Sequence, residues 1–210
     1  MTVIDHDPVL FGADVAEGIV AVEFVSPDGM KIYRREGTKT LVEEAEHKPF
    51  AWATEPLPGE LRELDGKNAY RFTVTFDSAG EFSRAKTQYK RELFALNDLA
   101  HQYLLASGRT LFKGMAFEDL RRMQVDIETF TPADGAMSDA GKDPLLAIAL
   151  SDSSGWEEIL VVEDPEDEEQ EKAALEKFVA LVRERDPDVI EGHNIFKFDL
   201  PYLETRARKL

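Results

Sequence analysis

The order of secondary structure in the second half of the chain limits the fold more than any other feature of the sequence. Residues 121–128, 145–151 and 157–162 are apolar or alternate between apolar and polar, which is typical of strands. Three strands on short connections favour an antiparallel meander. A helix then leads to the short strand "DVIEG", and a crossover of this kind allows that strand to lie parallel to the first one. If the two strands pair, the segment after the fourth strand emerges near Asp126 and Glu128.

The first half of the chain predicts a separate domain that is mostly β. Its four expected strands are residues 18–25, 30–35, 49–54 and 69–76. The turn signal "SPDG" joins the first two as a hairpin. The segment 83–106 has apolar residues at helical spacing in its later part, and Gly108 is a suitable stop. We therefore expect an α+β or α/β protein, with a β-rich N-terminal domain over residues 1–118 and a second domain over 119–210.

The first strand of the second domain carries two acids on one face. In "RRMQVDIETF" the apolar residues Met123, Val125 and Ile127 alternate with polar ones, so Asp126 and Glu128 share a face about 7 Å apart. That face either looks at water or holds a divalent metal ion. The spacing alone is a weak signal, because the chain has several other acid-x-acid pairs. Examples are Asp5/Asp7, Glu44/Glu46, Glu166/Glu168 and Asp186/Asp188.

The apolar surroundings of Asp126 and Glu128 favour the metal interpretation. Two carboxylates about 4 Å apart repel by roughly 4 kcal/mol at an effective dielectric near 20, and a somewhat wider pair still repels noticeably. A fold tolerates such a pair if water screens it or a cation neutralises it. The chain has no cysteine and only 4 histidines, so hard oxygen ligands indicate Mg²⁺ or Mn²⁺ rather than zinc.

The formal net charge of -17 sets a condition on any partner. A surface this acidic repels nucleic acid unless local basic patches or bound cations receive the phosphates. Adaptation to high salt is another origin for such a surface. The N-terminus lacks the pattern of a secretory signal, and no apolar run is long enough to span a bilayer. With no cysteine for disulfides, the composition fits a cytoplasmic protein without membrane contact.

A second stretch, "VIEGHNIFKFDLPYL", allows ordinary explanations for each of its polar and aromatic residues. Asp199 fits a helix N-cap, since Leu-Pro follows it. His193 and Asn194 fit a turn after a glycine. Phe196 and Phe198 fit a hydrophobic core. Each of these explanations is reasonable when the residues are considered one at a time.

Taken together, "DIET" and "GHNIFKFDLPYL" resemble the first two exonuclease motifs of family B DNA polymerases. The second motif, Asn-x-x-x-Phe-Asp, is matched by Asn194, Phe198 and Asp199. The preceding half is more loosely similar to the N-terminal domain of that family, through "KPFAWAT" and "YKRELFALNDLAHQYLLASG". The resemblance implies a ribonuclease H-like 3′→5′ exonuclease domain over residues 119–210.

The resemblance also implies roles for single residues. Asp126, Glu128 and Asp199 would be catalytic and would ligate two Mg²⁺ or Mn²⁺ ions. Asn194, Phe198 and His193 would contact the 3′-terminal nucleotides of single-stranded DNA or of a primer–template. Two groups of basic residues are candidates for contacts with the DNA backbone: Arg84, Lys86, Lys90 and Arg91, and Arg206, Arg208 and Lys209.

The chain departs from the family's pattern in one respect. None of its five tyrosines has an aspartate four residues later, so the third exonuclease motif, Tyr-x-x-x-Asp, is missing. We therefore expect a piece of a longer DNA polymerase whose nuclease is impaired when isolated and which self-associates through an uncovered face. Two alternatives stay open: a non-catalytic nucleic-acid-binding module on the same scaffold, and an acidic globular protein whose carboxylates only face solvent.

Overall fold

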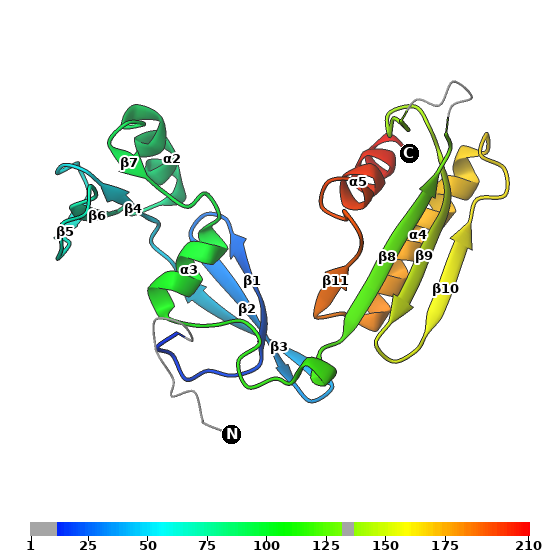
Figure 1. Cartoon of the computed structure of the whole chain (residues 1–210), viewed down its shortest axis with the longest axis horizontal. Helices are drawn as coiled ribbons and strands as arrows, with labels where there is room; N and C mark the ends of the chain where they lie inside the picture. Colours follow the sequence, from blue (N-terminus) through cyan, green and yellow to red (C-terminus); the bar gives the residue numbers. More distant parts are fainter. Residues whose placement is uncertain (1–11, 132–136) are drawn as a thin grey trace. The chain divides into compact units, whose positions relative to one another are not determined.

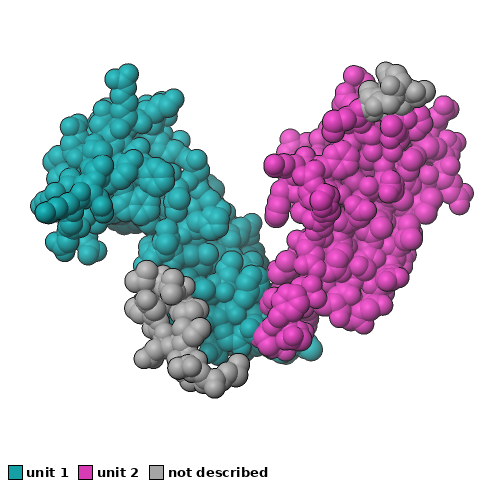
Figure 2. All heavy atoms as spheres, in the orientation of Figure 1, with its two compact units in different colours: residues 1–115 teal, residues 116–210 magenta. Residues whose placement is uncertain are grey.

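The computed structural model describes residues 12–131 and 137–210 and divides the chain into two compact units. Unit 1 comprises Met1–Met115 and unit 2 comprises Ala116–Leu210 (Figure 2). Helices and strands occur in both units, which confirms the predicted mixed architecture. No helix within the two described ranges is long and apolar enough to cross a bilayer.

Unit 1 contains two antiparallel sheets. The first has the order β1-β2-β3, and the cis peptide bond Ser26–Pro27 lies in the predicted turn between β1 and β2. The second sheet has the order β5-β6-β4-β7. The bounds of these elements are β1 (Ile19–Val25), β2 (Gly29–Glu36), β3 (Lys39–Glu46), β4 (Phe50–Ala53), β5 (Glu60–Glu63), β6 (Phe72–Thr75), α2 (Ala79–Gln88), β7 (Leu93–Phe94) and α3 (Leu99–Ser107).

The helical spacing expected in the later part of residues 83–106 is confirmed by α3, whereas the earlier part contains the end of α2 and the short strand β7, so two helices occupy this region. Asp98 starts the second of them: its side chain accepts hydrogen bonds from the backbone N–H groups of Ala100 and His101. A capping aspartate of this kind favours a new helix start. The predicted stop is confirmed, since Gly108 caps α3 in the left-handed conformation at φ 70°.

Unit 2 has the predicted order of three strands, a helix, a strand and a helix (Figure 1). Its sheet order is β10-β9-β8-β11, in which β8, β9 and β10 form the antiparallel meander and β11 lies parallel to β8. Both pairing predictions are thus confirmed. The bounds are the 3₁₀ helix η1 (Phe117–Asp119), β8 (Arg122–Thr129), β9 (Leu145–Asp152), β10 (Glu157–Val161), α4 (Glu168–Arg185), β11 (Val189–Glu191) and α5 (Asp199–Lys209).

One face of this sheet forms the core of unit 2 with both helices. The buried cluster takes Met123, Val125 and Ile127 from β8, and it includes Leu175 of α4 and Leu203 of α5. In Figure 1, α4 runs behind the sheet. The alternation predicted for β8 is confirmed, because its odd-numbered residues from 123 to 127 point into this core and the even-numbered ones do not.

Candidate functional site

Asp126 and Glu128 lie on the face of β8 that is turned away from the core. Both side chains are exposed, whereas Val125 and Ile127 beside them are buried. The pleat of the strand therefore places two carboxylates next to each other at the surface. Within the described residues, neither carboxylate forms a hydrogen bond or an ion pair.

The neighbouring strands present an apolar surface to these two carboxylates. Asp126 lies opposite Ala149 of β9, which in turn lies opposite Ile159 of β10. Glu128 lies opposite Ala147 of β9, which lies opposite Val161 of β10. Ile159 is 66% exposed and Val161 60%. The register shifts between Glu128 and Thr129, so an irregularity in the ladder adjoins the second carboxylate.

The turn after β11 passes close to the same part of β8, as predicted. A side chain at Gly192 would lie 2.5 Å from the carbonyl oxygen of Val125, so only glycine fits this approach. Asn194 follows with φ 56°, a left-handed conformation that asparagine tolerates better than most residues. The carbonyl of Asn194 accepts hydrogen bonds from the N–H groups of Lys197 and Phe198, which closes the turn.

The three residues predicted to contact DNA belong to this turn. His193 and Asn194 are exposed, in keeping with an ordinary turn as well as with a binding role. Phe198 is partly buried against the core, with its ring 5.4 Å from that of Tyr202. Phe196 is 80% exposed, so the expectation that it belongs to the core is wrong.

Asp199 is buried, unlike the two carboxylates of β8. It is the first residue of α5, which contacts β8, and it is only 2% exposed. The alternative explanation of Asp199 as an N-cap is wrong, because Phe198 occupies that position and forms no side-chain capping bond. In the described part of the chain the Asp199 carboxylate has no hydrogen-bonding or ionic partner. A buried carboxylate without a partner is costly unless a cation or a proton neutralises it.

The donor chemistry of these three carboxylates fits Mg²⁺ or Mn²⁺, which prefer hard oxygen ligands. Two of them are exposed and unpaired, and the third is buried and unpaired. Among residues 12–131 and 137–210, however, no group of three or more acidic or histidine side chains is close enough to hold one ion. The joint assignment of Asp126, Glu128 and Asp199 as metal ligands stays a prediction.

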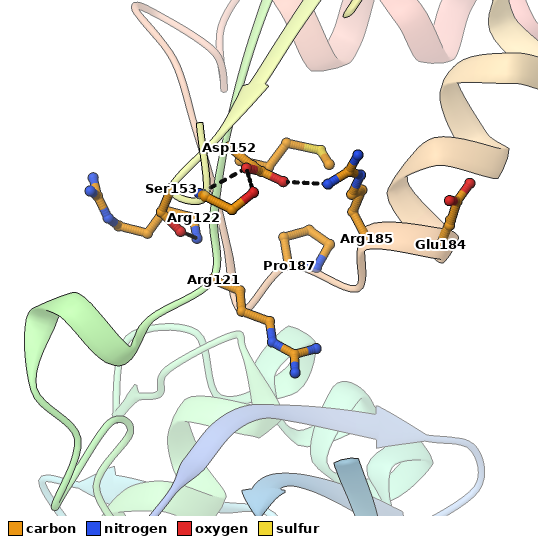
Figure 3. A pocket seen from close by; sticks show the side chains of 9 residues that line it. Arg121, Arg122, Asp152, Ser153, Glu184, Arg185 and Pro187 are labelled. Carbon is orange, nitrogen blue, oxygen red and sulfur yellow. Dashed lines mark hydrogen bonds and ion pairs between the residues drawn. The ribbon is translucent and has the colours of Figure 1, made fainter. Parts of the chain in front are cut away.

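A hollow of about 460 Å³ lies at the start of β8, away from Asp126 and Glu128 (Figure 3). Arginines pair with acidic side chains in and beside it. Arg122 forms an ion pair of 2.9 Å with Glu191, and Arg185 one of 3.1 Å with Asp152. Arg185 also lies over the ring of Trp156, 4.0 Å from its centroid. Each of these acids is therefore matched by a guanidinium group.

Asp152 shows how this matching affects acidity. Burial alone would raise the pKa of its carboxyl, but hydrogen bonds from Ser154 and Trp156 and the nearby Arg185 outweigh that effect. The pKa of Asp152 therefore lies below its ordinary value. The partners of Asp152 keep its carboxylate charged. Arg185 is in turn neutralised by Asp152, and Arg122 by Glu191.

One of the basic residues proposed for DNA contact is in fact buried. Arg206 forms an ion pair with Glu171 in which both side chains are 2% exposed, so its assignment to a surface patch is wrong. Hydrogen bonds to Glu171 raise the pKa of Arg206 further above its usual value. The sequence contains a signal for this burial, since Arg206 lies seven residues after Asp199, on the same helical stripe as Tyr202 and Leu203.

Comparison with known proteins decides the family. The profile described as "DNA polymerase family B, exonuclease domain" matches residues 105–210, half of the chain, and this match includes β8, β11 and the start of α5. The chain belongs to DNA polymerase family B. The recognition made from the motifs around Asp126 and Asp199 is thereby confirmed.

Archaeal relatives of this family B chain are all much longer than it. DNA polymerase 2 of Aeropyrum pernix is 43% identical over 91 residues, covering 43% of this chain and 11% of that protein. DNA polymerase 1 of Pyrococcus abyssi is 35% identical over 116 residues, 53% of this chain and 14% of that protein. The family B DNA polymerase of Pyrobaculum calidifontis shares the fold, with a TM-score of 0.64 and 19% identity over 90% of this chain and 31% of that one. The chain thus spans less than a third of the length of each of these three proteins.

Proposed function

We propose that unit 2 is the nuclease part of a proofreading DNA polymerase and removes nucleotides from DNA 3′ ends with the help of divalent metal ions. One observation carries the proposal. Asp126 and Glu128 are exposed on a single strand face, have no partner among the described residues, and lie within the segment that matches the exonuclease domain of the family. A solvated sheet face also carries alternating polar residues, so the proposal depends on the family match as well as on the exposure of the pair.

The proposed ligands are Asp126, Glu128 and Asp199, and the proposed ions are Mg²⁺ or Mn²⁺. Bound ions of this kind activate water and stabilise the leaving 3′ oxygen in phosphodiester hydrolysis. The task of the chain is then to hold three carboxylates in place with oxygens directed at one site. Asp199 lies at the start of α5 and has no partner among the residues that the structure describes. It is proposed as the ligand that completes the site from the side of α5.

The proposed substrate is the single-stranded 3′ end of DNA, and in the complete polymerase a primer–template. His193, Asn194 and Phe198 are proposed to contact the terminal nucleotides, because they belong to the turn that passes β8. An aromatic ring such as that of Phe198 offers a face for an unstacked base. Bound cations also reconcile the net charge of -17 with a phosphate substrate.

We keep two further proposals from the sequence. Self-association would use the open face of the sheet, where Ile159 and Val161 are exposed, and sedimentation at several concentrations would detect it.

A non-catalytic nucleic-acid-binding module is favoured by one observation, the lack of an assembled group of three ligands in the described residues. That module predicts the same DNA affinity for wild type and Asp126→Ala, with or without Mg²⁺.

Isothermal titration calorimetry of the chain with Mn²⁺ tests the proposed function. We expect saturable binding to the wild-type chain and loss of that binding in Asp126→Asn/Glu128→Gln. Glu44→Gln/Glu46→Gln is the matched control, because Glu44 and Glu46 form an exposed acid-x-acid pair on β3 of unit 1. Equal Mn²⁺ binding by wild type and by the Asp126/Glu128 variant would refute the proposed site.

A further inference from the structure

The buried ion pair between Glu171 and Arg206 ties together four segments of unit 2. Arg206 Nε donates a hydrogen bond of 2.6 Å to Glu171 Oε1, and Arg206 Nη2 donates to Oε2, so the contact is bidentate. Glu171 Oε1 also accepts a hydrogen bond of 3.0 Å from the N–H of Leu145, the first residue of β9. Arg206 Nη1 donates to the carbonyl of Ala140 at 3.3 Å. The pair therefore fixes the last turns of α5 against α4, β9 and the loop before β9.

Arg206 and Asp199 lie on the same stripe of α5. The buried residues of this helix are Asp199, Tyr202, Leu203 and Arg206, at i, i+3, i+4 and i+7. Seven residues of α-helix correspond to about 10 Å along the axis, so the ion pair and the Asp199 carboxylate are two turns apart on one rigid element. Between them, the hydroxyl of Tyr202 donates to the carbonyl of Asp143 at 2.8 Å, which adds a second fixed point.

The two ends of α5 are held in different ways. At its start, Phe198 provides no side-chain cap and Asp199 has no partner among the described residues. In the first turn, the hydroxyl of Tyr202 is bonded to the carbonyl of Asp143, and Phe198 and Leu203 pack in the core. Two turns after Asp199, the bidentate pair is the charged contact that fixes the rotation of the helix. The place of the Asp199 carboxylate relative to β8 therefore depends on this pair as well as on the core packing of α5.

We infer that the Glu171–Arg206 pair is a positioning device that orients α5 so that Asp199 can share a metal ion with Asp126 and Glu128. This inference rests on the proposed function. A buried ion pair is a poor source of net stability, since apolar side chains of similar volume often replace it without loss. A planar, bidentate contact does, however, fix one rotation and one distance, and that is what a ligand at the far end of the same helix needs.

Mn²⁺ binding to the 210-residue chain, measured by calorimetry below the melting temperature of every variant, tests the inference. The first variant, Glu171→Met/Arg206→Leu, removes the charges but keeps the apolar volume. The control, Arg208→Met, breaks the exposed ion pair of Arg208 with Glu204 near the same end of α5. We expect the affinity for Mn²⁺ to fall about ten- to hundredfold in the double variant and to stay unchanged in the control.

A second variant separates positioning from simple loss of structure. Arg206→Lys keeps the charge but cannot form the bidentate contact, and it decides the question if the double variant does not fold. We expect it to weaken Mn²⁺ binding when Asp199 is present and to have no further effect in the Asp199→Ala background. A purely structural role would instead lower the melting temperature in both backgrounds and leave the affinity alone.

The outcomes also distinguish this inference from the proposed function. A wild-type chain that binds Mn²⁺ and a folded Arg206→Lys variant that binds it equally well would overturn only the positioning role. A wild-type chain that binds no Mn²⁺ would overturn the proposed function, and the inference with it.

Discussion

The two ends of strand β8 treat negative charge in opposite ways. Around the start of the strand, Glu191 is paired with Arg122. Asp152 is paired with Arg185 (Figure 3), and the pKa of Asp152 is held below its usual value. Towards the end of the strand, Asp126 and Glu128 share one face and have no partner in the described ranges. The same sheet thus contains matched and unmatched carboxylates a few residues apart.

This difference shows that the carboxylates of unit 2 are not all placed next to basic partners. Under the proposed function, the carboxylates without a partner at the end of β8 are the ones that a bound cation would neutralise. The buried pair of Glu171 and Arg206 belongs with the matched group, and it holds the helix that carries the unmatched Asp199.

The largest expected effect comes from breaking the buried pair on one side only. In Arg206→Met the charge of Glu171 stays buried without its partner, which should lower the free energy of unfolding of unit 2 by about 3–5 kcal/mol. Urea denaturation measures this difference. Arg208→Met should change stability by at most about 1 kcal/mol, because its ion pair with Glu204 is exposed. Equal effects of the two substitutions would contradict the structural role of the buried pair.

At the matched end of β8, neutralising an acid should destabilise the fold. The Asp152 carboxylate accepts hydrogen bonds from the N–H and hydroxyl of Ser154 and from Arg185. Hydrogen bonds to a charged group are worth about 1.5–3 kcal/mol, so we expect Asp152→Asn to lower the free energy of unfolding by about that amount. Thermal and urea unfolding would measure it, and a neutral result would show that Asp152 is not matched in the folded chain.

The same carboxylate predicts how stability depends on pH. The pKa of Asp152 is lower in the folded chain than its ordinary value of 3.8, so the unfolded chain binds a proton more readily. The stabilisation is fully present above the ordinary pKa and is lost as the pH falls through the lower, folded value. Urea midpoints measured from pH 6 downwards should fall less steeply in Asp152→Asn than in wild type. Parallel profiles would contradict the lowered pKa.

At the unmatched end of β8, neutralising the two acids should stabilise the fold instead of destabilising it. Without metal, Asp126→Asn/Glu128→Gln removes the repulsion between two like charges about 7 Å apart, which is worth on the order of 0.5 kcal/mol near water. We therefore expect a small rise in the melting temperature of the metal-free chain, measured by calorimetry in the presence of a chelator. A fall in melting temperature would mean that these carboxylates have structural partners, and the comparison between the two ends would fail.

Much of unit 2 could be predicted from local patterns. The alternation in β8 determines which side chains enter the core, and it gave the correct positions for Met123, Val125 and Ile127. The parallel pairing of β11 followed from the crossover rule, and it places the turn at Gly192 beside β8. These features depend on the period of the sequence and on chain connectivity, which are visible without coordinates.

The errors concern contacts between distant residues. Arg206 has the composition of a surface cation near a helix end, and its burial depends on Glu171, 35 positions earlier in the sequence. The strand β7 was not predicted within residues 83–106, because it is only two residues long and is stabilised by pairing with β4, about forty residues away.

Anomalous diffraction from crystals of the chain soaked in MnCl₂ would show whether Asp126 and Glu128 bind metal, because it locates the ion. We expect a peak on the exposed face of β8, with oxygens of Asp126 and Glu128 at about 2.0–2.6 Å, the range of hard cation–oxygen contacts. Peaks only at the acidic start of α4, or none near β8, would contradict it and leave these carboxylates as ordinary solvated side chains.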